Sequence, residues 1–319
     1  FKDVARIMQN SVEYSAENND LKGALKIFSR VKDVIQKSKN EKVKKTLTDV
    51  LSSAGSGGLM KIIGTRLDTK EGIKDEDFKE YVSVLGTGAI PKLIELLGNL
   101  QTIQGRKKAI MALTFVGRRD IKAVAKGLAD QRWFVVRNVV LVLRETKDKK
   151  ALEHIARALG HEEPRVRREA IKGIGDLKGL KYIDRLVDHL HDEDQGVKVS
   201  AAAALGKLRN MMGLDALIAR VTEKAMLEED PVLLKKFFEA IASFKYDDVI
   251  GFLEDILRKN PFFGRAAYNE LKEAAIHCVG LIGDPRAKEL LEELADSKVK
   301  QISDGAKIAM KRIQRAKKR

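Results

Sequence analysis

The sequence contains few of the residues that hold small folds together through covalent bonds or metal ions. Cys278 is the only cysteine, and the 319 residues include five histidines and five prolines. A single cysteine excludes an intrachain disulfide framework, and no set of histidines has the spacing of a metal site. Cys278 lies in the apolar run 275–280, which favours a buried, unreactive thiol over a nucleophile.

Other absences exclude whole classes of function. No stretch approaches the roughly 18 consecutive apolar residues of a membrane-spanning helix. Phosphate-binding loops, dinucleotide fingerprints and nucleophile elbows are also missing. We therefore predict a protein that is not an enzyme, holds no cofactor and no metal, and does not span a membrane. The lone cysteine fits a reducing compartment, so we expect a cytoplasmic location.

The sequence does contain a period of 31 residues. Six residues of types that tolerate a positive φ recur at this step: Gly55, Gly86, Gly117, Asp148, Gly179 and Asn210. A chain needs such residues where it leaves one helix and turns sharply into the next. The series therefore predicts a repeated joint between helices.

Apolar residues recur in step with these joints. The residues four and seven places after each joint are aliphatic, as Ile183 and Leu186 are after Gly179. A second apolar pair precedes each later joint by eight and five places, as Ile171 and Ile174 do. Each repeat is thus predicted to be two helices that bury facing stripes only by stacking on neighbouring repeats. The predicted fold is an all-α solenoid, a superhelix of stacked antiparallel helix pairs.

The predicted organisation has two parts. Residues 1–54 form an N-terminal helical cap with helices near 2–17, 19–38 and 41–52, and residues 55–319 form the repeats. The expected units are 55–85, 86–116, 117–147, 148–178, 179–209, 210–246, 247–282 and 283–319. Acidic residues stand between the two helices of a unit, and we interpret them as helix starts rather than catalytic carboxylates: Asp130, Glu163, Asp194 and Asp230.

The second helices resemble those of HEAT repeats. The runs that carry the resemblance are Asp130-Gln-Arg-Trp-Phe-Val-Val-Arg-Asn138, Glu163-Pro-Arg-Val-Arg-Arg-Glu-Ala170 and Gly196-Val-Lys-Val-Ser-Ala-Ala202. The step of 31 residues is similar in particular to the short bacterial HEAT-like repeats, also called phycobilisome-lyase-type repeats, over about residues 50–319. The resemblance implies that Val166 and Val197 pack between helices, and that Arg167 and Lys198 meet acidic residues of an adjoining unit.

In HEAT solenoids the second helices line the concave face, so the resemblance makes cations on these helices candidate partner contacts. The candidates, with the one tryptophan of the chain, are Arg132, Trp133, Arg137, Arg165, Arg168, Lys172, Lys198, Lys235, Lys236 and Lys272. Acidic residues share the same helices, among them Glu169, Asp176, Glu239 and Glu273. The face is therefore either positive or mixed in charge.

A second basic set lies at the C-terminus. The net charge is +15, and residues 298–319 hold nine Lys or Arg against one acidic residue. The predicted final helix carries Lys307, Lys311, Arg312, Arg315, Lys317, Lys318 and Arg319. These residues fit either a solvated end cap or an electrostatic contact for nucleic acid, an acidic protein or an anionic surface.

These observations favour a non-catalytic scaffold that binds a protein or peptide on the concave face of the second helices. The alternative is a nucleic-acid-binding HEAT-like protein that uses the basic groove and the basic C-terminal helix. Its most remote version has alkylpurine DNA glycosylase-like activity, with Asp130 beside Trp133 and Phe134 as the only candidate carboxylate. A third reading, a tetrapyrrole lyase or chaperone, rests only on the name shared with the repeats. The oligomeric state stays open.

Overall fold

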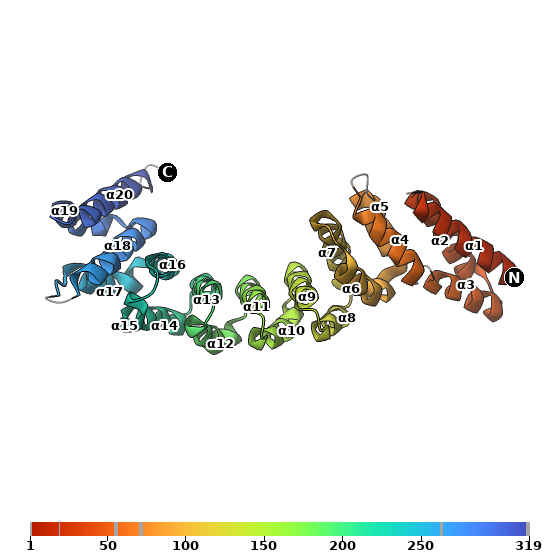
Figure 1. The fold of residues 1–319 in the computed structure, drawn as a ribbon, viewed down its shortest axis with the longest axis horizontal. Coiled ribbons are helices and arrows are strands. Elements are labelled where there is room, and N and C mark those ends of the chain that lie inside the picture. Colours follow the sequence, from red (N-terminus) through yellow and green to blue (C-terminus); the bar gives the residue numbers. More distant parts are fainter. Residues whose placement is uncertain (1, 19, 54–56, 70–72, 262–263, 317–319) are drawn as a thin grey trace. The chain divides into compact units, whose positions relative to one another are not determined.

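The computed structural model describes residues 2–18, 20–53, 57–69, 73–261 and 264–316, and every regular element within these ranges is a helix. The chain divides into two compact units, Phe1–Ala158 and Leu159–Arg319. Each unit is a stack of antiparallel helix pairs, as the 31-residue pattern predicts (Figure 1). The all-α solenoid fold is therefore confirmed.

The first unit arranges its helices in two layers. In one layer α1 (Lys2–Glu17), α4 (Gly57–Leu67), α6 (Ile90–Asn99) and α8 (Ile121–Ala125) contact one another in order. In the other, α2 (Leu21–Lys37), α5 (Asp75–Leu85), α7 (Ile103–Gly117) and α9 (Trp133–Glu145) do the same. Helix α3 (Glu41–Ser53) packs on α1 and α2, and α10 (Leu152–Arg157) follows α9. Short 3-10 turns, such as η2 (Lys126–Ala129), connect several of these helices.

The second unit also consists of first and second helices. Its second helices, α11 (Pro164–Asp176), α13 (Gln195–Leu208), α16 (Pro231–Ile241), α18 (Arg265–Ile282) and α20 (Lys300–Ala316), pack on one another in sequence. The first helices are α12 (Ile183–Asp188), α14 (Met211–Thr222), α17 (Tyr246–Arg258) and α19 (Lys288–Ala295), with the short α15 (Lys224–Leu227) after α14. The helix stack of this unit is curved, and Figure 1 shows its second helices on the inner side of the curve.

The predicted apolar stripes form the core. Ile171, Ile174 and Leu186 are fully buried, and Ile183 is 4% exposed. Cys278 is also fully buried, and burial raises the pKa of its thiol, which keeps the sulfur protonated. The acidic helix starts are confirmed for α11, α13 and α16: the carboxylates of Glu163, Asp194 and Asp230 each accept a backbone N–H of the first turn. The prediction was wrong for Asp130, which lies two residues before Arg132, the N-cap residue of α9, and accepts the N–H of that arginine instead of capping the helix.

Positive φ angles occur at several predicted joints. At three of these joints, the residue with the positive φ lies one position earlier than predicted. Gly86 has the expected positive φ of 66°. Asp148, Gly179 and Asn210 instead have φ of −93°, −79° and −98°, so the prediction was wrong there. These residues begin the next helix, and the side chains of Asp148 and Asn210 cap it. The left-handed residues are Lys147, Lys178 and Arg209, with φ of 60°, 58° and 53°.

Gly117 departs from the prediction in another way. It is the last residue of α7 and is not among the described residues with positive φ. A Cβ at Gly117 would lie 2.7 Å from Cγ2 of Val124 on α8. The glycine therefore allows the close approach of the next helix rather than an unusual backbone angle. Gly55, the first of the predicted series, lies outside the described residues.

Candidate partner-binding face

The candidate residues fall on the second helices of both units. In the first unit, Arg132 is the N-cap residue of α9, and Trp133 and Arg137 lie on that helix. In the second unit, Arg165, Arg168 and Lys172 lie on α11, Lys198 on α13, Lys235 and Lys236 on α16, and Lys272 on α18. The candidates therefore form one set in each unit.

In the first unit, Arg132 is held by its own helix pair. Its guanidinium donates two hydrogen bonds of 2.9 Å to the carboxylate of Asp130, and a longer one of 3.4 Å to Asn99 at the end of α6. The hydrogen bonds from Arg132 hold the pKa of the Asp130 carboxyl below its usual range. Both carboxylate oxygens of Asp130 are thus engaged by Arg132, and the carboxylate anchors this arginine between two repeats.

The aromatic residues beside Arg132 form a small cluster. Trp133 is half-buried and meets Phe134 edge to face, with ring centroids 5.9 Å apart. Arg137 donates a hydrogen bond of 3.0 Å to the side chain of Asn138. These side chains therefore support the start and first turns of α9.

In the second unit, cations of the second helices pair with acids of the next repeat. Arg167 on α11 is 8% exposed and forms two hydrogen bonds, of 2.9 and 2.7 Å, with the carboxylate of Asp192 before α13. Burial alone would raise the pKa of Asp192, but its hydrogen bonds outweigh this effect and the pKa is lowered. Val166 and Val197 are fully buried. The roles that the HEAT resemblance implies for Val166 and Arg167 are thus confirmed.

Glu229, in the turn before α16, accepts hydrogen bonds from cationic side chains of two helices. Lys198 on α13 donates to both of its carboxylate oxygens, at 2.9 and 2.7 Å. Arg220 on α14 is 4% exposed and donates to the same carboxylate at 2.6 Å. Burial works to raise the pKa of Glu229, but the two cations lower it further than burial raises it. The HEAT resemblance implies that Lys198 meets an acidic residue of the adjoining unit, and its contact with Glu229 confirms this.

Four further candidate cations of this face also pair with acids. Contacts within a repeat join Arg165 to Glu163 at 2.6 Å and Lys236 to Glu239 at 2.7 Å. Contacts with the next repeat join Arg168 to Asp194 at 4.0 Å and Lys235 to Glu273 at 2.9 Å. Lys207 at the end of α13 pairs with Asp176 of the preceding repeat. The face of the second unit is thus mixed in charge rather than uniformly positive.

Two candidates on this face have no acidic partner: Lys172, which is exposed, and Lys272, which is buried. Lys172 on α11 is exposed and makes no ion pair or side-chain hydrogen bond with the described residues. Lys272 on α18 is 5% exposed, and its ammonium donates to the amide oxygen of Asn260 at 2.8 Å. Burial lowers the pKa of Lys272. Lys172 is available to a partner in solution, whereas Lys272 is enclosed by its own repeat.

The basic C-terminal helix α20 packs on α18 and α19 through one face, with Ile302, Ala306 and Ile313 buried. Arg312 lies 3.2 Å from the Nδ1 atom of His277 on α18. The cations Lys307, Lys311 and Arg315 are exposed and unpaired among the described residues, while Lys317, Lys318 and Arg319 lie outside them. The final helix is therefore part of the core and carries free cations only on its outer side.

The sequence pattern did not identify Asp192 and Glu229 as the acidic partners of Arg167 and Lys198. Asp192 and Glu229 are separated from their cationic partners Arg167 and Lys198 by 25 and 31 residues. A search for opposite charges one repeat apart would have found Lys198 with Glu229 and Lys207 with Asp176. The described residues hold no cluster of potential metal ligands, and none of their helices is long and apolar enough to cross a membrane.

Comparisons with known proteins agree with the fold. Residues 155–226 match the family model described as HEAT repeats. No curated protein matches the chain. A similar solved structure is the karyopherin Kap121p bound to the extreme C-terminus of the protein phosphatase Cdc14p, with 14% identity, a TM-score of 0.52, and coverage of 96% of this chain and 37% of that one. Another is a Kap95:Nup1 complex, with 11% identity, a TM-score of 0.50, and coverage of 92% and 44%. The chain thus spans less than half the length of these karyopherins, and the likeness is one of fold.

Proposed function

We propose that this HEAT-repeat chain is a non-catalytic scaffold that binds a protein partner on the face of its second helices. The observation that carries the proposal is the pairing of charges along α11, α13, α16 and α18. Alternating cations and anions present hydrogen-bond donors and acceptors to a polypeptide. A nucleic acid backbone, in contrast, needs unpaired cations to replace its counterions.

The similar solved structures are consistent with this proposal. The karyopherin Kap121p was solved with the extreme C-terminus of a phosphatase, and Kap95 in a complex with Nup1. Stacked repeats give extended surfaces of this kind without any catalytic residue. The exposed, unpaired Lys172 on α11 marks the point from which the face is best tested.

A photocrosslinking experiment tests the face directly. The residue p-benzoylphenylalanine replaces Lys172 on α11 in one variant and Asp184 on α12 in a matched control, since both side chains are exposed in the same repeat region. We expect a discrete protein crosslink from position 172 and none from position 184 in extracts of the source cell. Equal crosslinking at the two positions, or crosslinks only to nucleic acid, would contradict the proposal.

A further inference from the structure

The second unit concentrates exposed apolar side chains along the edge where its second helices turn into the next first helices, here called the joint edge. Among the residues of the second unit that the structure describes, six large hydrophobic side chains are exposed: Leu180, Met211, Met212, Val232, Leu281 and Ile308. Leu180, Met211 and Met212 lie within two residues of the predicted joints Gly179 and Asn210, and Leu281 lies two residues before Gly283, the left-handed residue that ends α18. Exposed apolar side chains that gather on one edge typically mark an interaction surface.

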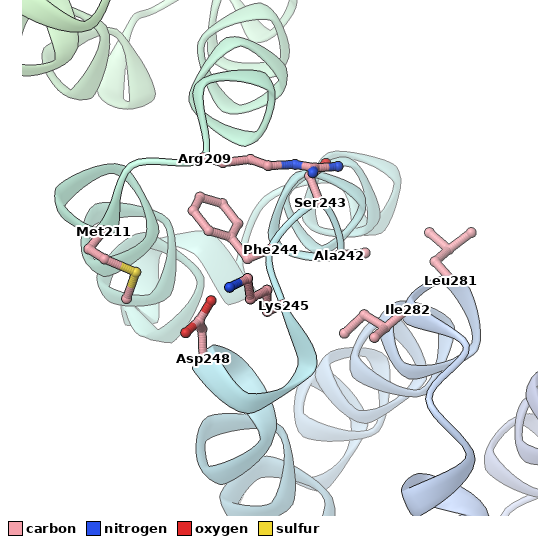
Figure 2. A pocket seen from close by; sticks show the side chains of 9 residues that line it. All are labelled: Arg209, Met211, Ala242, Ser243, Phe244, Lys245, Asp248, Leu281 and Ile282. Atoms are coloured by element: carbon pink, nitrogen blue, oxygen red, sulfur yellow. The ribbon is translucent and has the colours of Figure 1, made fainter.

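A depression of about 270 Å³ lies on this edge. Figure 2 shows Met211 at the start of α14 on one side and Leu281 and Ile282 at the end of α18 on the other, with Phe244 between them. Phe244 is 6% exposed, whereas Met211 and Leu281 are 50% and 45% exposed. The depression therefore has a buried aromatic floor and flexible aliphatic walls, which suit a large apolar side chain.

Two cations border this depression and lack partners. Arg209 is the left-handed residue that ends α13, and Lys245 is the N-cap residue of α17. Both side chains are exposed, and neither forms an ion pair or side-chain hydrogen bond with the described residues. Asp248 is the one acidic residue that lines the depression. The residues that line the depression therefore carry a net positive charge. The paired cations of the second helices, in contrast, are neutralised by their acidic partners.

We propose that this joint-edge depression binds an acidic segment of a partner protein through one large apolar side chain. The apolar walls take the side chain, and Arg209 and Lys245 pair with carboxylates that flank it. Phe244 is too buried to stack on a nucleobase, which favours a polypeptide over single-stranded nucleic acid. This inference rests on the proposed scaffold function and places a second contact on a different surface from the face of the second helices.

The test uses the full chain and three labelled synthetic dodecapeptides in fluorescence anisotropy. The first peptide has a central Leu-Phe pair flanked by glutamates, the second replaces the pair with serines, and the third replaces the glutamates with lysines. We expect saturable binding of the first peptide alone. No binding of the first peptide at about 1 mM, or equal binding of all three, overturns the proposal.

Substitutions then locate the bound peptide. Arg209→Glu and Leu281→Ser should each weaken binding about tenfold or more, whereas Arg209→Lys should retain it. The matched controls are Arg185→Glu, an exposed cation on α12, and Leu180→Ser, an exposed apolar residue at the preceding joint, which should change affinity less than about twofold. Equal losses in the controls would show that the peptide binds elsewhere.

Different results would reject the proposed binding face of the second helices and the proposed joint-edge site. Lack of peptide binding together with a protein crosslink from position 172 would reject the joint-edge site alone. Peptide binding that depends on Arg209 and Leu281, without a crosslink from position 172, would support the joint-edge site and reject the face of the second helices.

Discussion

Several buried charged side chains of the second unit form ion pairs that hold neighbouring helices together. Glu229 joins Lys198 of one helix to Arg220 of another, and Asp192 holds the buried guanidinium of Arg167. Removing one member of such a pair leaves the other charge buried without a partner, which costs far more than the loss of an exposed ion pair. These residues therefore contribute to the stability of the stack before they contribute to recognition.

Glu229→Gln should lower the free energy of unfolding at neutral pH, with Glu228→Gln, an exposed neighbour, as the matched control. The pKa of Glu229 is lowered in the folded chain, so its contribution is fully present above its unfolded pKa of about 4.3 and is lost as pH falls through the folded value. Urea titrations between pH 7 and pH 3 should show the difference between wild type and Glu229→Gln shrinking below about pH 4. A difference that is constant with pH would contradict the assigned pairing.

At the scale of helices, glycines set how closely the second helices approach. A Cβ at Gly206 on α13 would lie 2.7 Å from the backbone oxygen of Ala240 on α16. A Cβ at Gly280 on α18 would lie 3.0 Å from the Cα of Ala309 on α20. Because the neighbouring atoms belong to the backbone, a larger residue must separate the two helices.

Gly206→Ala should therefore destabilise the second unit by about 1–3 kcal/mol, although alanine is the better helix former by about 1 kcal/mol. Gly251→Ala on α17 is the control, since its added Cβ meets nothing within 4 Å, and it should be neutral or stabilising by up to about 1 kcal/mol. Thermal unfolding followed by circular dichroism measures both changes. Stabilisation by Gly206→Ala would mean that α13 and α16 are less closely packed than described.

For the whole molecule, the net charge of +15 overstates the charge that is free to bind an anion. On α11, α13 and α16, six of the eight cations are neutralised by acids within hydrogen-bonding distance: Arg165, Arg167, Lys198, Lys207, Lys235 and Lys236. Besides Lys300 at its start, the unpaired cations of α20 among the described residues are Lys307, Lys311 and Arg315 on its outer side. Because α20 also supplies buried residues to the core, its charges are better tested by substitution than by truncation.

The triple substitution Lys307→Ala, Lys311→Ala and Arg315→Ala should remove most of the affinity of the chain for labelled oligonucleotides at about 50 mM salt. Three phosphate contacts predict a fall in wild-type affinity of about 40-fold between about 50 and 200 mM salt. Fluorescence anisotropy measures both effects. A fall of about 10³ or more that survives the triple substitution would place nucleic acid on the second helices and favour the alternative function.

The sequence by itself determined the repeat and the core, because both depend on local periodicity. The aliphatic pairs such as Ile183 and Leu186 recur with the spacing of one helix face, and hydrophobic burial requires that face to lie inside the stack. It also determined the helix starts at Glu163 and Asp194, since a cap acts within three residues of the chain.

Only the tertiary structure decided which charges are free and which residue turns at each joint. Arg209 rather than Asn210 takes the left-handed angle, because Asn210 is engaged in capping α14. The neutralisation of Lys198 depends on Glu229, which lies a full repeat away and is brought near only by stacking. A net charge is a property of the sequence, whereas a binding surface depends on the distances between charges, and those distances come from the packing of one repeat on the next.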